Sequence, residues 1–143
     1  MPNRRDIFKL AAFQAPLGAP FLAMIAAAAE NKLANGTVDK SQAKVTHEEF
    51  GDLRVYHEGR TDQLGALTFG SLLLKPEMSP HPPHQHPEEE IMILTEGAGE
   101  ISVEGKVTKV AAGSSMYCGA GKLHGIVNTG KSPLLFYYFK WKA

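Results

Sequence analysis

A chain of 143 residues, of which 43% are apolar, has room for one folded domain with a single core. Its 15 lysines and arginines equal its 15 aspartates and glutamates, so it lacks the long-range field that draws a protein to nucleic acid or to an anionic membrane. Cys118 is the only cysteine, which excludes an intramolecular disulfide and a zinc site built from cysteines. We therefore expect a small-molecule partner and no nucleic-acid partner.

Residues 1–29 have the layout of an export signal. Arg4 and Arg5 precede an apolar, charge-free stretch at 10–29 that ends in a run of alanines. The segment around the two arginines resembles the bacterial twin-arginine motif, with Asn3 where serine or threonine is usual. A membrane-spanning segment is the alternative, since the stretch approaches the length that crosses a bilayer, but its two prolines argue against it. We expect a cleaved signal, no membrane insertion after cleavage, and a periplasmic or secreted protein.

The rest of the chain divides into a leader and a β domain. Residues 30–43 are polar and lack apolar periodicity, which predicts a flexible leader. Residues 44–143 contain short runs of β-branched and aromatic residues broken by glycine, proline or charged pairs, which predicts strands and no helix. The expected strands are Lys44–Phe50, Leu53–Glu58, Ala66–Lys75, Glu89–Glu96, Gly99–Glu104, Lys106–Val110, Ser114–Cys118, His124–Asn128 and Pro133–Trp141. Glu104 and Gly105 predict a tight hairpin, and the whole pattern predicts an all-β sandwich or barrel.

Imidazoles and carboxylates gather in the loop and strand at 80–90. In an extended chain His84, His86 and Glu90 have the same parity, so their side chains share one face. Three ligands from one ribbon cannot close around a cation, and His124, which follows a glycine-rich turn, is the natural fourth. The alternative is that the two loop histidines are solvated and that His124 is an ordinary core residue.

At these residues the sequence resembles the cupin family, over about a hundred residues from Val45 to Trp141. The first cupin motif is matched by His84 and His86, followed by Glu90 and Gly97 at the family's spacing. Its leading glycine is missing, since Met78 stands there.

The second cupin motif is also present. It is matched by Gly113, Gly121, His124 and Asn128, with Gly119 where proline is usual. The departures from both motifs affect turn residues rather than ligands. The resemblance implies a double-stranded β-helix, or jelly-roll barrel, at 44–143 that holds one metal ion. It also gives weaker support for a homodimer, because cupins commonly dimerise. The aromatic residues at 136–141 also suit a strand that packs against a second subunit.

Three imidazoles and one carboxylate suit Fe(II), Mn(II), Ni(II), Cu(II) or Zn(II). Export by the twin-arginine route carries folded proteins, so the metal would be loaded in the cytoplasm, which favours manganese or iron. Beyond the ligands, we select His81 and Tyr117, together with Glu90, as catalytic candidates. For His81 the alternative is a solvated loop side chain, and for Tyr117 it is packing. Glu88 and Glu89 are acid or base candidates that equally suit a solvated rim.

Two functions remain open. The first is a metal-dependent enzyme on a small oxygen-rich organic molecule; cupins with such ligands include dioxygenases, decarboxylases, isomerases, lyases and ureide hydrolases, and we favour dioxygenase-like chemistry. The second is a non-catalytic binding module for a sugar or organic acid, with a structural metal. Fold alone does not choose between them.

Overall fold

The computed structural model describes residues 31–143, so the expected export signal lies outside the described residues. The described part consists of nine strands and contains no helix that could cross a membrane. The strands are β1 (Lys44–Glu48), β2 (Gly51–Gly59), β3 (Ala66–Leu74), β4 (Glu89–Glu96), β5 (Ala98–Val103), β6 (Lys106–Ala111), β7 (Ser115–Cys118), β8 (His124–Val127) and β9 (Leu134–Lys142).

All nine predicted strands are present, with ends that differ from the prediction by two residues at most. The tight hairpin is confirmed as well. Glu104 and Gly105 both have positive φ angles, of 49° and 81°, and they join β5 to β6 so that Val103 pairs with Lys106. Two consecutive residues with positive φ match the right-handed twist of the flanking strands, which is why this turn closes in two residues.

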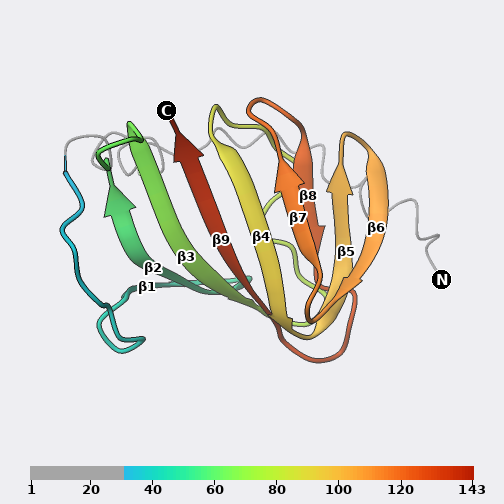
Figure 1. Cartoon of the computed structure of the whole chain (residues 1–143). Helices are drawn as coiled ribbons and strands as arrows, with labels where there is room; N and C mark the ends of the chain where they lie inside the picture. The colour runs from blue at the N-terminus through green and yellow to red at the C-terminus, as the bar shows by residue number, and fades with distance from the viewer. Residues whose placement is uncertain (1–30) are drawn as a thin grey trace.

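The strands form two antiparallel sheets that face each other, as in a jelly-roll barrel (Figure 1). The larger sheet has the order β1-β2-β3-β9-β4-β7, and the smaller has the order β6-β5-β8. The all-β double-stranded β-helix that the sequence predicts is therefore the observed fold.

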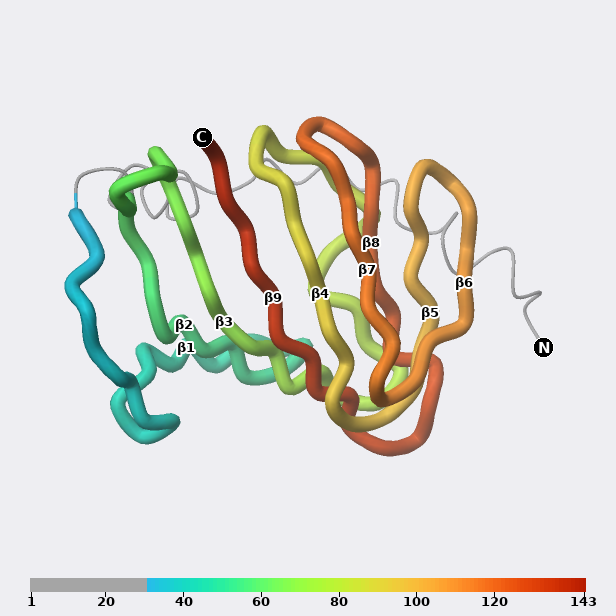
Figure 2. The backbone as a smooth tube through the Cα atoms, in the orientation of Figure 1, coloured from blue at the N-terminus to red at the C-terminus, as the bar shows by residue number. Residues whose placement is uncertain are grey.

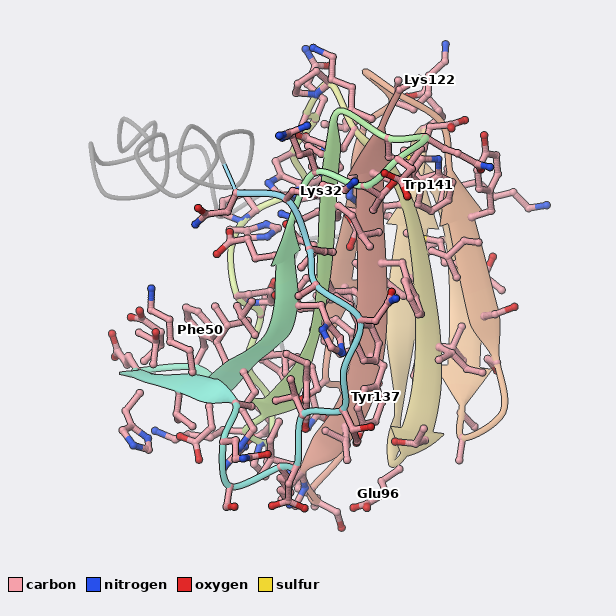
Figure 3. The ribbon with its side chains drawn as sticks, turned by 60° about the vertical axis from the view of Figure 1, so that its left-hand side comes forward. Lys32, Phe50, Glu96, Lys122, Tyr137 and Trp141 are labelled. Carbon is pink, nitrogen blue, oxygen red and sulfur yellow. The ribbon has the colours of Figure 1, made fainter. Side chains whose placement is uncertain are left out.

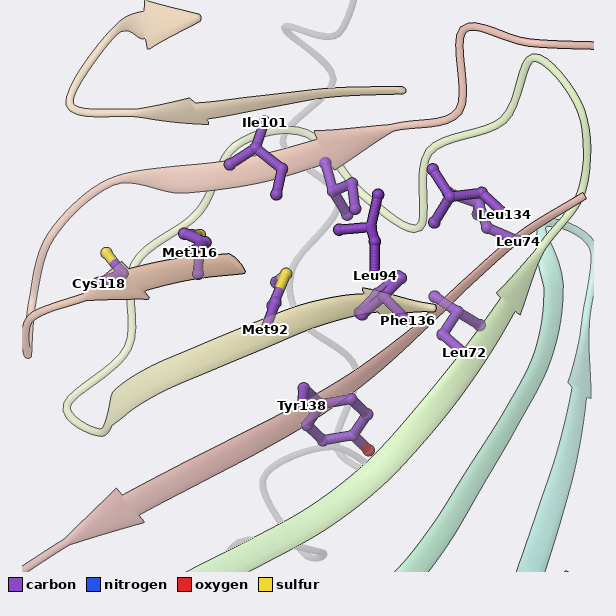
Figure 4. Close-up of a cluster of buried hydrophobic side chains, with 11 residues drawn as sticks. Leu72, Leu74, Met92, Leu94, Ile101, Met116, Cys118, Leu134, Phe136 and Tyr138 are labelled. Carbon is purple, nitrogen blue, oxygen red and sulfur yellow. The ribbon is translucent and has the colours of Figure 1, made fainter. Parts of the chain in front are cut away.

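The core fills the space between the two sheets (Figure 4). On β4 the alternation is strict: Met92 and Leu94 are buried, whereas Ile91 and Ile93 are exposed. The aromatic run of β9 also alternates, with Phe136 and Tyr138 inside and Tyr137 and Phe139 outside. The members of the core cluster are Leu72, Leu74, Met92, Leu94, Ile101, Met116, Cys118, Ile126, Leu134, Phe136 and Tyr138.

One end of the barrel collects the candidate ligands. Figure 3 shows Lys122 and Trp141 at this end and Glu96 at the other. Strand β4 starts beside Trp141, because Glu89 is the register partner of Trp141, and β8 starts two residues after Lys122. Since Glu90 and His124 stand at these two strand starts, the fold brings them to the same end.

The segment at 31–43 runs beside the edge of the larger sheet (Figure 1). The amide of Leu33 donates to the carbonyl of Arg60 at 2.9 Å, and the amide of Arg60 donates to the carbonyl of Asn31 at 2.8 Å. The first described residues of the expected leader are therefore paired with the end of β2. The division of the chain into signal, leader and barrel stays a prediction.

Candidate metal centre

The loop between β3 and β4 runs along β8 and is held to it by backbone hydrogen bonds (Figure 2). The amide of His84 donates to the carbonyl of His124 at 2.8 Å, and the amide of His124 donates back to the carbonyl of His84 at 2.9 Å. The amide of Gly121, a residue with a φ of 71°, donates to the carbonyl of His86 at 2.8 Å. These three bonds join the two histidine-bearing segments.

Three imidazole rings and one carboxylate meet at this junction. One ligand nitrogen from each of His84, His86 and His124 lies within 4.8 Å of the others. The Glu90 Oε2 atom lies 2.8 Å from the His86 Nε2 atom and 2.9 Å from the His124 Nε2 atom. The side chains are largely shielded from solvent, with His86 8% exposed and His124 1% exposed. The four residues selected from the sequence are thus together in space.

The hydrogen-bonding partners of two rings indicate that a cation belongs here. The Nδ1 atom of His86 faces the Glu88 carbonyl at 3.0 Å, and that of His124 faces the Lys122 carbonyl at 3.0 Å. Each Nε2 atom faces the Glu90 carboxylate. Both partners of each ring are acceptors, but a neutral imidazole has only one N–H. Either both rings carry an extra proton, or a metal ion takes the place of the proton at Nε2.

The donor set fits a metal ion. Metal-binding histidines usually donate their second ring N–H to a carbonyl or carboxylate, as these two do through Nδ1. Two donors bound at about 2.1 Å and at right angles to one ion lie about 3 Å apart. The carboxylate-to-imidazole separations of 2.8 and 2.9 Å match this spacing. Together with the fold, the three converging histidines make this end of the barrel a candidate metal site.

The electrostatics of the site favour the ligand forms of Glu90 and His84. Burial alone would raise the pKa of Glu90, but the contacts with His124 and His86 outweigh it and lower the pKa to about 2. Burial, reinforced by the neighbouring His81, lowers the pKa of His84 to about 3. For His124 the burial effect is opposed by the Glu90 carboxylate, and the pKa is raised. At neutral pH, Glu90 is an anion and His84 is neutral.

His81, selected as a catalytic candidate, adjoins the site. Its ring stacks on that of His84, with the centroids 3.7 Å apart. Its Nδ1 atom faces the carbonyl of Pro82 at 2.9 Å, and burial lowers its pKa. Because a carbonyl can only accept, Nδ1 carries the hydrogen in the neutral ring, which leaves the lone pair on Nε2.

The two acidic candidates before Glu90 differ in position. Glu88 is buried, and its Oε2 atom lies 3.2 Å from the His86 Nδ1 atom without a hydrogen-bond partner among the described residues. Because Glu88 lies beside the His86 ring, and that ring faces Glu90, Glu88 is placed to orient the proposed ligand His86. Glu89 is turned to the outer face of the sheet, where it accepts a hydrogen bond from Tyr117 at 2.6 Å.

Tyr117 lies on the outer face of the sheet rather than in the barrel interior, and its role as a catalytic candidate stays a prediction. On β7 the buried residues are Met116 and Cys118, so the pleat turns Tyr117 to the outer face, where it is 59% exposed. Cys118 is 2% exposed, and burial raises the pKa of its thiol. His47 on β1 lies apart from these residues in the register of the sheet and has its Nδ1 atom 2.8 Å from the Asp52 Oδ1 atom.

Two residues of β9 near the site are absent from the sequence-based selection. Tyr138 and Lys140 have the parity of the inward-facing Phe136, and Lys140 is the register partner of Glu90. Their two-residue spacing predicts that both side chains are on the same face of the strand. Because β9 has aromatic residues on both faces, however, its sequence does not show which face is turned inward.

The described surface has depressions, among them two with volumes of about 460 and 450 Å³. The first is lined by Phe50, Met78 and His81 among others, and the second by residues that include Glu100 and Lys109. Neither is lined by His84, His86, Glu90 or His124. The first adjoins the metal centre through His81, Pro83 and Gly125.

Known proteins share this architecture. A family model described as a cupin domain matches residues 71–139, a range that contains both motifs. No curated protein matches the chain.

Among solved structures, an RmlC-like cupin from Shewanella frigidimarina has a TM-score of 0.63 at 16% identity, over 77% of this chain and 93% of that chain. A predicted oxalate decarboxylase from Thermotoga maritima has a TM-score of 0.61 at 22% identity, over 76% and 100%. The polyketide cyclase RemF from Streptomyces resistomycificus has a TM-score of 0.61 at 18% identity, over 77% and 81%. The chain therefore has the fold of a cupin barrel, and its residues 71–139 match the cupin domain.

Proposed function

We propose that His84, His86, Glu90 and His124 hold one divalent transition-metal ion, and that the protein is a metal-dependent enzyme acting on a small oxygen-rich organic substrate. The observation that carries the proposal is the acceptor-only surroundings of the His86 and His124 rings. One divalent ion bound to the Nε2 atoms of His86 and His124 would satisfy both rings and the Glu90 carboxylate. An extra proton on each ring would instead place two imidazolium charges in a site that is shielded from solvent. Manganese and iron are the favoured ions, with nickel, copper and zinc as alternatives.

The bound ion would supply Lewis acidity or oxygen activation at positions that the four ligands leave open. The chain's own residues would set the charge at the ion and the orientation of its ligands. Glu90 supplies a fixed negative charge, and the carbonyls of Glu88 and Lys122 hold two imidazoles with Nε2 toward the centre. His81, neutral with its lone pair on Nε2, is the group suited to accept a proton from a substrate. Oxygen chemistry of the dioxygenase type is the reaction class that we favour.

The neighbours do not select the reaction. Among them are a predicted oxalate decarboxylase and a polyketide cyclase, and at 22% and 18% identity they share the fold alone. A binding module with a structural metal is the second candidate. It is favoured by the position of the two depressions, neither of which is lined by the four ligands.

Metal content tests the proposal. We expect the purified chain to hold about one manganese or iron ion, and a His84→Ala, His86→Ala double variant to hold none. A His47→Ala variant, which removes an exposed histidine paired with Asp52, controls for non-specific binding and should keep the ion. Elemental analysis of the three proteins gives the answer. Equal metal in all three, or none in the wild type, contradicts the proposal.

We also propose that a second copy of the chain covers the outer face of the larger sheet. Four neighbouring side chains there are apolar and exposed by 39 to 59%: Ile91, Ile93, Tyr117 and Phe139. Register pairs Ile91 with both Tyr117 and Phe139, so the patch is continuous across three strands. A patch of this kind can meet its own copy about a two-fold axis.

An Ile93→Lys variant is expected to shift the protein from dimer to monomer, because it places a charge within this patch. Sedimentation equilibrium measures the mass. A Val107→Lys variant is the control, since Val107 is similarly exposed, at 47%, but lies on β6 in the other sheet. A monomeric wild type, or an Ile93→Lys variant that remains dimeric, rules out this interface.

A further inference from the structure

A β-bulge at Tyr56 turns the side chain of Glu58 toward the barrel interior. Before the bulge, Val55 is buried, so the odd-numbered residues of β2 face inward. Beyond it, His57 pairs with Phe69 and stacks on its ring. Phe69 belongs to the outer face, because the core leucines of β3 have the opposite parity. Since directly opposed residues share a face, His57 is turned outward, and Glu58 takes the inward position.

Glu58 is the first member of a polar row that crosses the larger sheet. Its register partner on β3 is Thr68, which pairs with Lys140 of β9, and Lys140 pairs with Glu90 of β4. Lys140 already has an interaction partner. Glu58 and Thr68 are half-buried, so both remain accessible to a solute. Neighbouring strands lie about 4.8 Å apart, which separates Glu58 from Glu90 by about 14 Å along the curved sheet. The reach of the two side chains shortens this span to that of a small organic molecule.

The hydroxyl of Tyr138 lies one row deeper on the same wall. Its register partner on β3 is Gly70, where a Cβ atom would overlap the hydroxyl oxygen and the ring carbon that carries it. The lack of a side chain at Gly70 thus lets the phenol point across β3 (Figure 4). Burial and the negative charges of Glu90 and Glu58 raise the pKa of Tyr138, and no hydrogen bond from another described residue contributes.

A carboxylate and a phenol hydroxyl on one wall are suited to bind hydroxyl groups. An ionised carboxylate only accepts hydrogen bonds, so the ligand atom that faces Glu58 has to carry a hydrogen. A ligand carboxylate in this place would meet the like charge of Glu58, and a methyl group would leave Glu58 unpaired. An ammonium group could pair with Glu58 but has no lone pair to accept a hydrogen bond from Tyr138. A hydroxyl group both donates and accepts, so it suits both residues.

We propose that Glu58 and Tyr138 bind neighbouring hydroxyl groups of the substrate, and that the substrate class is a small polyhydroxy compound such as a polyol or a monosaccharide. The inference rests on the proposed function, because another oxygen of the same molecule would face the metal ion. Glu58 accepts a charge-assisted hydrogen bond from one hydroxyl, and Tyr138 donates to the next. The two residues determine specificity and take no part in holding the metal.

Xylitol and 1,2-pentanediol are the probes. They share a five-carbon chain and a terminal diol that can face the metal ion, and they differ in the three remaining hydroxyls of xylitol. Calorimetric titrations of the full chain, with and without Mn(II), compare the wild type with the Tyr138→Phe and Glu58→Gln variants. Tyr137→Phe is a matched control on the outer face of β9, and Glu96→Gln is one at the other end of the barrel (Figure 3). The metal content of each protein is measured beforehand.

We expect the wild type to prefer xylitol over 1,2-pentanediol. The Tyr138→Phe and Glu58→Gln variants should each bind xylitol about tenfold more weakly, with the affinity for 1,2-pentanediol and the metal content unchanged. Both controls should behave as the wild type. A wild type without the preference, or undiminished xylitol binding in either variant, overturns the inference. So does a loss of metal in either variant, since that residue would then serve the metal site itself.

A wild type that takes up no Mn(II) contradicts the proposed function, and this result is distinguishable from failure of the inference. In that case the titrations without metal decide. A preference for xylitol that both Tyr138→Phe and Glu58→Gln abolish supports the inference, and the absence of a preference overturns it.

Discussion

A Glu90→Gln variant is expected to keep its fold but to bind its metal ion at least about a hundredfold more weakly. Loss of a group that only orients a ligand typically weakens metal binding by about 10- to 100-fold, so this loss is larger. The amide has nearly the shape of the carboxylate but no charge. The Oε2 atom of Glu90, which lies 2.8 and 2.9 Å from the two Nε2 atoms, would be replaced by a neutral amide oxygen that attracts a cation less strongly. The variant thus isolates the charge of Glu90 from its packing.

Thermal unfolding with increasing Mn(II) measures this effect. An ion that binds the folded state alone stabilises it by about 2.7 kcal/mol at a concentration one hundred times the dissociation constant. We expect this gain in the wild type and its absence in Glu90→Gln at the same concentration. Glu89→Gln is the matched control, because the neighbouring Glu89 carboxylate is bonded to Tyr117 on the outer face. Equal metal stabilisation of wild type and Glu90→Gln would remove Glu90 from the ligand set.

An Asn128→Ala variant is expected to lower the free energy of unfolding by about 3 kcal/mol. Asn128 has no exposed surface. Its Nδ2 group donates to the carbonyls of Leu74, Lys75 and Ser132 at 2.8 to 3.2 Å, and its Oδ1 atom accepts from the amide of Gly130 at 3.0 Å. Alanine leaves these backbone groups without their partner in a place that water does not reach.

Urea unfolding curves give this difference, provided that the slope of the transition stays the same. Asn35→Ala is the control, because Asn35 is exposed in the segment that precedes β1. A change of less than about 0.5 kcal/mol in Asn128→Ala, the level typical of surface substitutions, would show that its hydrogen bonds are replaced at no cost. Metal content should be unaffected, since Asn128 lies at the far end of β8 from His124.

The strands and three of the four proposed ligands could be predicted because they depend on local pattern. Short apolar runs between turn residues mark strands, and the parity of His84, His86 and Glu90 sets their common face whatever the rest of the chain does. His124 needed more than parity, since its distance from His84 depends on how β8 meets the loop. The resemblance to the second cupin motif supplied that information.

The orientation of Tyr117 and Lys140 could not be predicted. Each stands on a strand whose two faces are both partly apolar, so hydrophobicity does not distinguish inside from outside. For Tyr117 the decision comes from the neighbouring Met116 and Cys118, which pack into the core. The acceptor-only surroundings of the imidazoles depend on carbonyls brought near by the chain's path, and no sequence pattern encodes them.

The reciprocal backbone bonds between His84 and His124 also determine where the chain tolerates a change of length. An extra residue between His84 and Glu90 would reverse the face of one histidine or of the glutamate, because side chains alternate along an extended backbone. The tip of the β5–β6 hairpin is constrained as well, because the amide of Glu104 donates to the carbonyl of Leu123 at 2.8 Å and the amide of Leu123 donates to the Glu104 Oε1 atom at 2.7 Å. Loop extensions or inserted peptides between His84 and Glu90 are thus incompatible with the metal centre, and at the hairpin tip they would disturb Leu123, the residue before His124.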